Sequence, residues 1–173
     1  QALIPPQYGY AFDRAQGALL NFEAADASTT MADDFGNTWT AAGNAQIDTA
    51  QSKFGTASLL LDGTGDYVIS SGYTTLGDGS WEMACWFRIN ALPGVGTYSQ
   101  IFQVVNAGGF GASLRLFNSA GTTKLEINVS DNGTSANVIG AGAGTNTVWT
   151  LSQWNRVRLV FDALGATYRV YLS

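Results

Sequence analysis

Apolar and polar side chains alternate most clearly in the stretch from Trp81 to Ile89. Every second residue of this stretch is apolar, namely Trp81, Met83, Cys85, Phe87 and Ile89. Because successive side chains of a strand point to opposite faces, the pattern predicts a β-strand with one face in a core. Trp86 places a large aromatic ring on the other face. Either a second packed layer covers that ring, or it is exposed and contacts a sugar or a partner.

The same alternation predicts further short strands along the chain, over residues 18–23, 45–49, 57–61, 67–70, 99–105, 112–118, 124–130, 138–139, 155–161 and 168–172. Turns rich in Gly, Asn and Asp separate them, and residues 26–40 are predicted to form a long loop. Two pairs of strands predict hairpins, namely 57–61 with 67–70 and 112–118 with 124–130. No segment has good helical periodicity, so the sequence predicts an all-β sandwich or barrel.

Composition narrows the class of protein. The chain has 173 residues, of which 46% are hydrophobic and 12% are charged, which suits one domain with a substantial core. Its formal net charge of −5 argues against nucleic-acid binding, which needs a basic surface, and against electrostatic attachment to anionic membranes. No apolar run approaches the roughly 20 residues that span a bilayer, so membrane insertion is not expected.

Two residue types restrict the chemistry. Cys85 is the single cysteine, so an intrachain disulfide and a cysteine-based zinc cluster are excluded, and we interpret it as a small buried hydrophobe. The sequence has no histidine, which removes the commonest general base and the commonest transition-metal ligand.

The N-terminal segment, residues 1–17, is predicted to be an arm or linker. Pro5 and Pro6 favour extended backbone there. The segment either docks on a neighbouring chain or lies on its own domain, which we place at residues 18–173. Gln1 is not a methionine, so we expect either a processed start or a fragment.

Seven short blocks in order resemble one family. They are Leu20-Asn21-Phe22-Glu23, Asp34-Phe35-Gly36-Asn37, Lys53-Phe54-Gly55-Thr56-Ala57, Leu61-Asp62-Gly63-Thr64-Gly65-Asp66-Tyr67-Val68, Trp81-Glu82-Met83-Ala84-Cys85-Trp86-Phe87-Arg88, Trp154-Asn155-Arg156-Val157 and Tyr168-Arg169-Val170-Tyr171-Leu172. The chain resembles laminin-G-like, concanavalin A-like lectin/glucanase domains, which occur in secreted bacterial proteins and in phage virion and tail proteins. The resemblance implies a jelly-roll sandwich of two antiparallel sheets.

Members of that family usually continue beyond a strand like the one predicted at 168–172 with further strands that close the sheet. We therefore expect either a C-terminally incomplete domain or a sheet edge that another subunit completes, because an unpaired edge is a liability.

Catalysis is not expected. The related glucanases use two carboxylates on one strand, and glycoside hydrolysis needs two such groups about 5 to 9.5 Å apart. Here Glu82 and Glu126 each stand alone on their predicted strands. A catalytic serine triad is not expected either, because the sequence has no histidine to act as its general base.

Calcium is the cofactor that best fits the loops. Hard cations take several oxygen ligands from Asp, Asn and backbone carbonyls. One candidate loop holds Asp33, Asp34 and Asn37, and another holds Asp62 and Asp66. The alternative is that these side chains only cap turns.

Sugar binding would use exposed aromatic rings on rim loops. The candidates are Trp39, Tyr73, Tyr98 and Trp149, although each is also suited to a core or an interface. Trp81 and Trp154 are predicted to be core residues.

Two functions remain. The first is a non-catalytic virion or appendage structural or decoration protein with a lectin-like domain, which would assemble with neighbouring subunits as a homo-oligomer. The second is a carbohydrate-binding module of a secreted bacterial protein, with surface glycans as its ligands. Both place the protein on a virion, outside the cell or at a cell surface.

Overall fold

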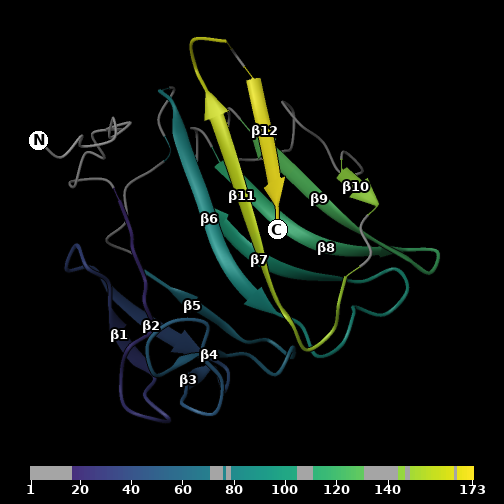
Figure 1. Cartoon of the computed structure of the whole chain (residues 1–173). Helices are drawn as coiled ribbons and strands as arrows, with labels where there is room; N and C mark the ends of the chain where they lie inside the picture. Colours follow the sequence, from purple (N-terminus) through teal and green to yellow (C-terminus); the bar gives the residue numbers. More distant parts are fainter. Residues whose placement is uncertain are drawn as a thin grey trace, which may run out of the picture. The chain divides into compact units, whose positions relative to one another are not determined.

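The computed structural model shows an all-β chain (Figure 1). It describes residues 17–70, 76, 79–104, 111–130, 144–146, 149–165 and 167–173, with backbone alone for 144–146. Residues 1–16 of the predicted arm, Tyr73 and the predicted strand at 138–139 lie outside these residues. The chain divides into two compact units, Gln1–Thr74 and Thr75–Ser173. No helix in the described part is long and apolar enough to cross a membrane.

The described residues of the first unit form five short strands in two small antiparallel sheets. They are β1 (Thr30–Ala32), β2 (Thr38–Ala42), β3 (Gln46–Asp48), β4 (Ser58–Leu60) and β5 (Tyr67–Ile69). Their order is β1-β2-β5 in one sheet and β3-β4 in the other. Met31, Ile47 and Ala57 form the buried centre of this unit. The strands predicted at 45–49, 57–61 and 67–70 are confirmed.

The strand predicted at 18–23 is wrong. Phe22 has a φ of 58°, in the left-handed region, which a strand residue cannot adopt. Leu20 and Phe22 nevertheless pack against the Met31 cluster, so their hydrophobicity reflects burial without sheet pairing. The loop predicted at 26–40 is also wrong, since β1 and part of β2 lie inside it.

The hairpin predicted from 57–61 and 67–70 is a third error. Strand β4 pairs with β3, and β5 pairs with β2. Side chains between the strands fix this arrangement, because Asp66 accepts hydrogen bonds from the backbone N–H of Asn44 (3.0 Å) and of Asp62 (2.6 Å). The 62–66 connection is therefore tied to the segment before β3.

A clasp between Glu23 and the Gly55-Thr56 turn joins two distant segments of this unit. Glu23 accepts hydrogen bonds from the Thr56 hydroxyl (2.6 Å) and the Thr56 backbone N–H (2.9 Å). These bonds lower the pKa of Glu23 below its ordinary value of 4.5. Gly55 has a φ of +63°, which favours glycine, and a Cβ there would have to displace the Glu23 carboxylate from this position.

The described residues of the second unit form seven strands. They are β6 (Trp81–Arg88), β7 (Tyr98–Val104), β8 (Gly111–Ser119), β9 (Thr122–Ser130), β10 (Gly144–Asn146), β11 (Trp154–Asp162) and β12 (Thr167–Leu172). They form two antiparallel sheets, β10-β9-β8-β7 and β12-β11-β6. The sequence predicted all of these strands except β10, and the hairpin of β8 and β9 is confirmed.

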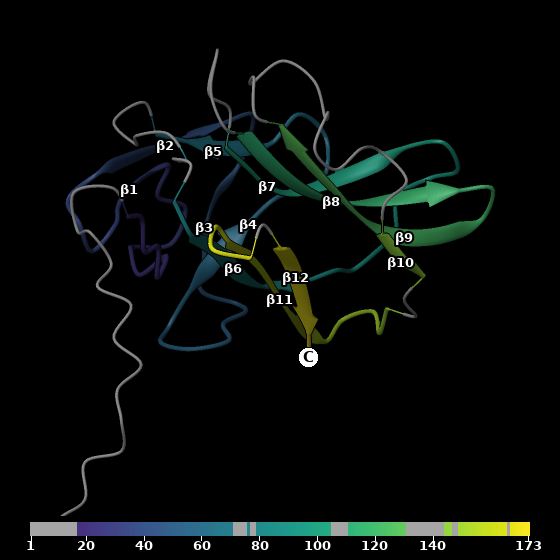
Figure 2. The same cartoon turned by 90° about the horizontal axis from the view of Figure 1, so that it is seen from above.

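The two sheets of this unit face each other across a shared core, which makes it sandwich-like (Figure 2). Leu114, Leu116 and Leu125 of one sheet form a buried cluster with Val157 of the other. Cys85 packs against this cluster, in agreement with its interpretation as a small hydrophobe, and burial raises the pKa of its thiol to about 12.

Strands β8 and β9 form a long hairpin that turns one face to the core and one face away. Leu114 and Leu116 are fully buried, while Ser113 and Arg115 project on the opposite face. The connecting turn has two residues, Ala120 and Gly121, with φ values of 52° and 89°. Positive φ at both positions is typical of a type I′ turn, which fixes the register of the two strands.

Candidate functional site

The face of strands β7, β8 and β9 that points away from the core carries a connected set of polar and aromatic side chains. We call it the polar sheet face and define it by Tyr98, Gln100, Ser113, Arg115, Phe117, Glu126 and Asn128. Alternation places them there, and the strand register pairs Tyr98 with Phe117, Gln100 with Arg115, Arg115 with Glu126, and Ser113 with Asn128.

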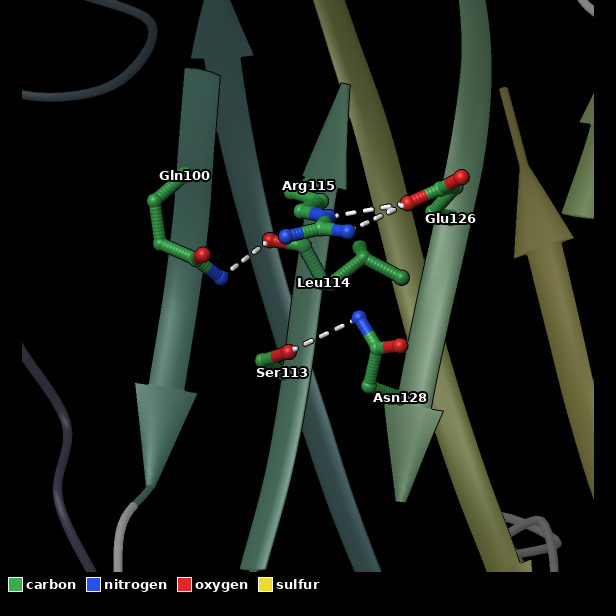
Figure 3. A network of polar contacts seen from close by, with 6 residues as sticks. All are labelled: Gln100, Ser113, Leu114, Arg115, Glu126 and Asn128. Atoms are coloured by element: carbon green, nitrogen blue, oxygen red, sulfur yellow. Dashed lines mark hydrogen bonds and ion pairs between the residues drawn. The ribbon is translucent and has the colours of Figure 1, made fainter. Parts of the chain in front are cut away.

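An ion pair between Arg115 and Glu126 lies at the centre of this face (Figure 3). The Arg115 Nε and Nη2 atoms lie 2.9 and 2.8 Å from the same carboxylate oxygen, Oε2 of Glu126. Glu126 is only 3% exposed. A buried carboxylate usually has all its acceptors occupied, yet no hydrogen bond among the described residues reaches Glu126 Oε1.

The Glu126 side chain is almost completely covered, with 4% of it exposed. In the described part of the chain, the buried side-chain polar atoms without a partner are the indole nitrogens of Trp81 and Trp149.

Aromatic rings flank the guanidinium. Its carbon lies 4.6 Å from the centre of the Tyr98 ring and 5.8 Å from that of Phe117. Such cation–π contacts restrain the arginine and hold it towards Glu126. Tyr98 is 56% exposed, so part of its ring remains open to solvent.

Two amides complete the face. Gln100 donates its Nε2 hydrogens to the carbonyls of Phe102 (2.7 Å) and Leu114 (2.9 Å), at the bulge where β7 and β8 shift register. Asn128 donates to the Ser113 hydroxyl over 3.4 Å, which is a weak bond. Gln100 is thus fixed, whereas Asn128 can turn its amide towards a ligand.

A similar ion pair on the other sheet serves as a comparison. Arg158 donates from Nε to Oε1 of Glu82 (2.6 Å) and from Nη2 to Oε2 (2.7 Å), so each carboxylate oxygen has a donor of its own. Their side chains are 33% and 25% exposed. The pair in the polar sheet face differs because both donors converge on one oxygen.

The first loop predicted to bind calcium is filled by hydrogen bonds. Asp33 accepts four, from the backbone N–H of Phe35 (3.0 Å) and Asn37 (2.8 Å), the Asn37 amide (2.8 Å) and the Trp39 indole (3.1 Å). Burial raises the pKa of Asp33, but the bonds from Asn37 and Trp39 outweigh it and leave the pKa lowered. Both oxygens of Asp34 accept the Asn21 amide at 3.1 Å.

The second predicted loop also uses its carboxylates internally. Asp62 accepts from the Asn44 amide (2.7 Å) and the Thr64 backbone N–H (2.8 Å), and these bonds lower its pKa. Among the described residues, no group of three or more metal-ligating side chains forms. Calcium binding stays a prediction, and at either loop it would have to displace bonds that already stabilise turns.

The described aromatic residues that were predicted to bind sugars are Trp39 in the first unit and Tyr98 and Trp149 in the second. Trp39 packs against the core of the first unit. Trp149 packs against the core of the second and lies 5.5 Å from Phe87, between ring centres. Tyr73 lies outside the described residues. Tyr98 belongs to the polar sheet face, where it is joined by Arg115, which the sequence analysis did not single out.

Comparison with protein-family models finds no match, and neither does comparison with curated proteins. The function must therefore be argued from the geometry of the polar sheet face.

Proposed function

We propose that this chain is a non-catalytic lectin-like domain of a virion or appendage protein, and that it attaches to surface glycans through the polar sheet face. The observation that carries the proposal is the Tyr98 ring, which is 56% exposed and lies against the Arg115 guanidinium on a face that also carries polar side chains. Sugars present hydroxyl groups and apolar ring faces, which need acceptors and aromatic surfaces together.

The charges on this face favour binding over hydrolysis. Glycoside hydrolysis uses two carboxyl groups on either side of the scissile bond. Glu126 is the single carboxylate in the polar sheet face as defined, and Arg115 holds one of its oxygens. That arrangement provides a fixed hydrogen-bond acceptor.

The jelly-roll topology belongs to the same proposal. The two facing antiparallel sheets of the second unit support it, as does the resemblance of the sequence blocks to concanavalin A-like domains. A carbohydrate-binding module of a secreted bacterial protein would use the same face, and it differs from a virion protein in acting without assembly into an oligomer.

Strand β12 favours the assembly half of the proposal. Arg156 and Ser173 exchange two backbone bonds of 2.7 and 3.2 Å, so alternate residues of β12 turn their backbone groups away from β11. Val170 and Leu172 are such residues, and β12 is an edge of its sheet in the described part. A strand of a neighbouring subunit can pair there.

An array of immobilised oligosaccharides tests the glycan half. We expect wild-type protein to bind neutral glycans, Tyr98→Ala to lose the signal, and Tyr171→Ala to keep it. Tyr171 is the matched control, because its ring also lies near an arginine of an ion pair, at 5.2 Å from Arg158. An empty array, or equal binding by all three proteins, would refute glycan binding by this face. Light scattering of the wild-type chain tests assembly, which a monomer at high concentration would refute.

A further inference from the structure

We infer that β12 pairs with β12 of a second copy of this chain, antiparallel and with Tyr171 directly opposite the partner's Tyr171. This inference rests on the assembly half of the proposed function, because it names the partner and the register at that edge. The β12-β11-β6 sheets of the two copies would then form one continuous sheet across a two-fold axis.

The backbone groups of β12 alternate in direction. Arg156 and Ser173 exchange two backbone bonds, so every second residue of β12 faces β11 and the residues between them face away. Tyr171 faces β11, whereas Val170 and Leu172 turn their N–H and C=O groups to the outer side. In the described part of the chain, no strand pairs with β12 on that side. The backbone of both residues is therefore directed towards an added strand.

This edge is exposed and regular. The side chains of Tyr171 and Leu172 are 48% and 39% exposed. Leu172 lies on the same side of the sheet as Val170, which packs against the core, so an added strand would cover an apolar side chain at the end of that core. Strand β12 has no proline and pairs with β11 without a register shift, whereas the edge strand β7 carries a bulge, a feature that discourages edge pairing.

Charge decides the register. Arg169 is the one charged side chain of β12, and 54% of it is exposed. Pairing centred on Arg169 would place two arginines directly opposite each other, which is destabilising. Pairing centred on Val170 would place Arg169 opposite the partner's Tyr171. The Tyr171 ring already lies 5.2 Å from the Arg158 guanidinium, so two guanidinium groups would converge there. Pairing centred on Tyr171 places Arg169 opposite the partner's Ser173 and keeps the charges apart.

The same register matches the apolar side chains. Val170 comes opposite the partner's Leu172, and the facing backbone groups of such a pair can exchange two hydrogen bonds. On the other side of the sheet the two Tyr171 rings meet, and aromatic pairs are among the favourable cross-strand pairs. Because both strands present the same residues, a second copy of this chain satisfies the edge, and the contact closes after two chains.

Disulfide trapping tests the register. Tyr171→Cys and Arg169→Cys each also carry Cys85→Ala, so the introduced thiol is the single one in the chain. Directly opposite residues that are not hydrogen-bonded to each other have Cα atoms about 4.5 Å apart, within the range that a disulfide spans. We expect mild oxidation to convert most of Tyr171→Cys into a covalent dimer. Arg169→Cys is the matched control on the same face, and it should stay largely monomeric because the two positions lie about 13 Å apart along the strands.

Sedimentation equilibrium measures the same contact without a disulfide. We expect the wild-type chain to form a dimer of twice the 18.2 kDa mass of one chain. Tyr171→Ala should raise the dissociation constant about tenfold or more, since tyrosines at the centre of an interface are common hot spots. Leu172→Pro removes an N–H that points away from β11, so it should abolish the dimer and leave the far-UV circular dichroism of the chain unchanged.

The outcomes separate this inference from the proposed function. If the wild-type chain oligomerises but Arg169→Cys cross-links as fully as Tyr171→Cys, or neither cross-links, the inference is wrong while assembly stands. If the wild-type chain stays monomeric at high concentration, the proposed assembly fails and the inference with it. If the Tyr171→Cys dimer forms while the oligosaccharide array stays empty, glycan binding fails and the inference stands.

Discussion

Replacing Arg115 by methionine should destabilise the protein much more than the same change at Arg158. The first substitution leaves the Glu126 carboxylate, which is 3% exposed, without its guanidinium. Removing one partner of a fully buried pair costs about 3–5 kcal/mol. Because Arg115 is itself 23% exposed, we expect about 2–3 kcal/mol for Arg115→Met. For Arg158→Met, where water reaches both partners, about 1 kcal/mol or less is expected.

Urea unfolding followed by tryptophan fluorescence measures both changes. Four of the five tryptophans lie in the second unit, so the signal reports mainly on the unit that holds both ion pairs. The double variant Arg115→Met with Glu126→Gln should regain about 1–2 kcal/mol relative to Arg115→Met alone, because it removes the stranded charge.

Two results would refute this reasoning. If the two arginine variants lose equal stability, burial does not distinguish the pairs. If the double variant is no more stable than Arg115→Met, then the loss at Arg115 comes from its contacts with the aromatic rings and not from an uncompensated carboxylate.

Three further predictions concern other parts of the chain. Gly55→Ala should lower the stability measured in urea clearly more than Gly63→Ala. Both substitutions incur the left-handed φ penalty of about 1–2 kcal/mol, but only Gly55→Ala displaces Glu23. Equal losses of stability would contradict the clasp between Glu23 and Thr56. The pKa values of Asp33 and Glu23 are lowered in the folded state, so the stability that these groups contribute is complete above their ordinary pKa values of 3.8 and 4.5. This stability is lost as the pH falls through the lowered pKa values. Thermal melts from pH 2 to 7 should show the melting temperature falling in this acid range, and Asp33→Asn should make the fall smaller. Burial raises the pKa of the Cys85 thiol to about 12. At pH 8 this thiol should therefore react with Ellman's reagent at least about a hundredfold more slowly in native protein than in urea-unfolded protein. A fast reaction in native protein would disprove the burial of Cys85.

The sequence predicts the second unit well because its strands are long enough to show a period. In β9, Leu125, Ile127 and Val129 alternate with polar residues, and a short turn with Gly121 precedes them. In the first unit β1 has three residues, which is too few for any periodicity to appear. Phe22 shows another limit, since an apolar residue at a positive φ looks the same in sequence as a strand residue.

The candidate site was partly predictable. Counting outward from the two-residue turn pairs Arg115 with Glu126, so the sequence contained the signal for an ion pair on the face away from the core. The direction of the guanidinium was not predictable, because side-chain conformation decides whether its two donors share one oxygen or take both. The role of Asp33 shows the same limit. In the sequence alone, a loop carboxylate is compatible with binding calcium and with capping a turn, and only the structure shows that four N–H groups donate to Asp33.

The two-residue turn between β8 and β9 also bears on how the protein folds. Arg115 and Glu126 are eleven positions apart along the chain, whereas β6 meets β11 across 76 positions at Glu82 and Arg158. Closing a short loop loses less chain entropy than closing a long one, and local hairpins form within about 1–10 μs. The β8–β9 hairpin is therefore expected to form early and to bring these two charges together before the distant strands of the opposite sheet have found each other.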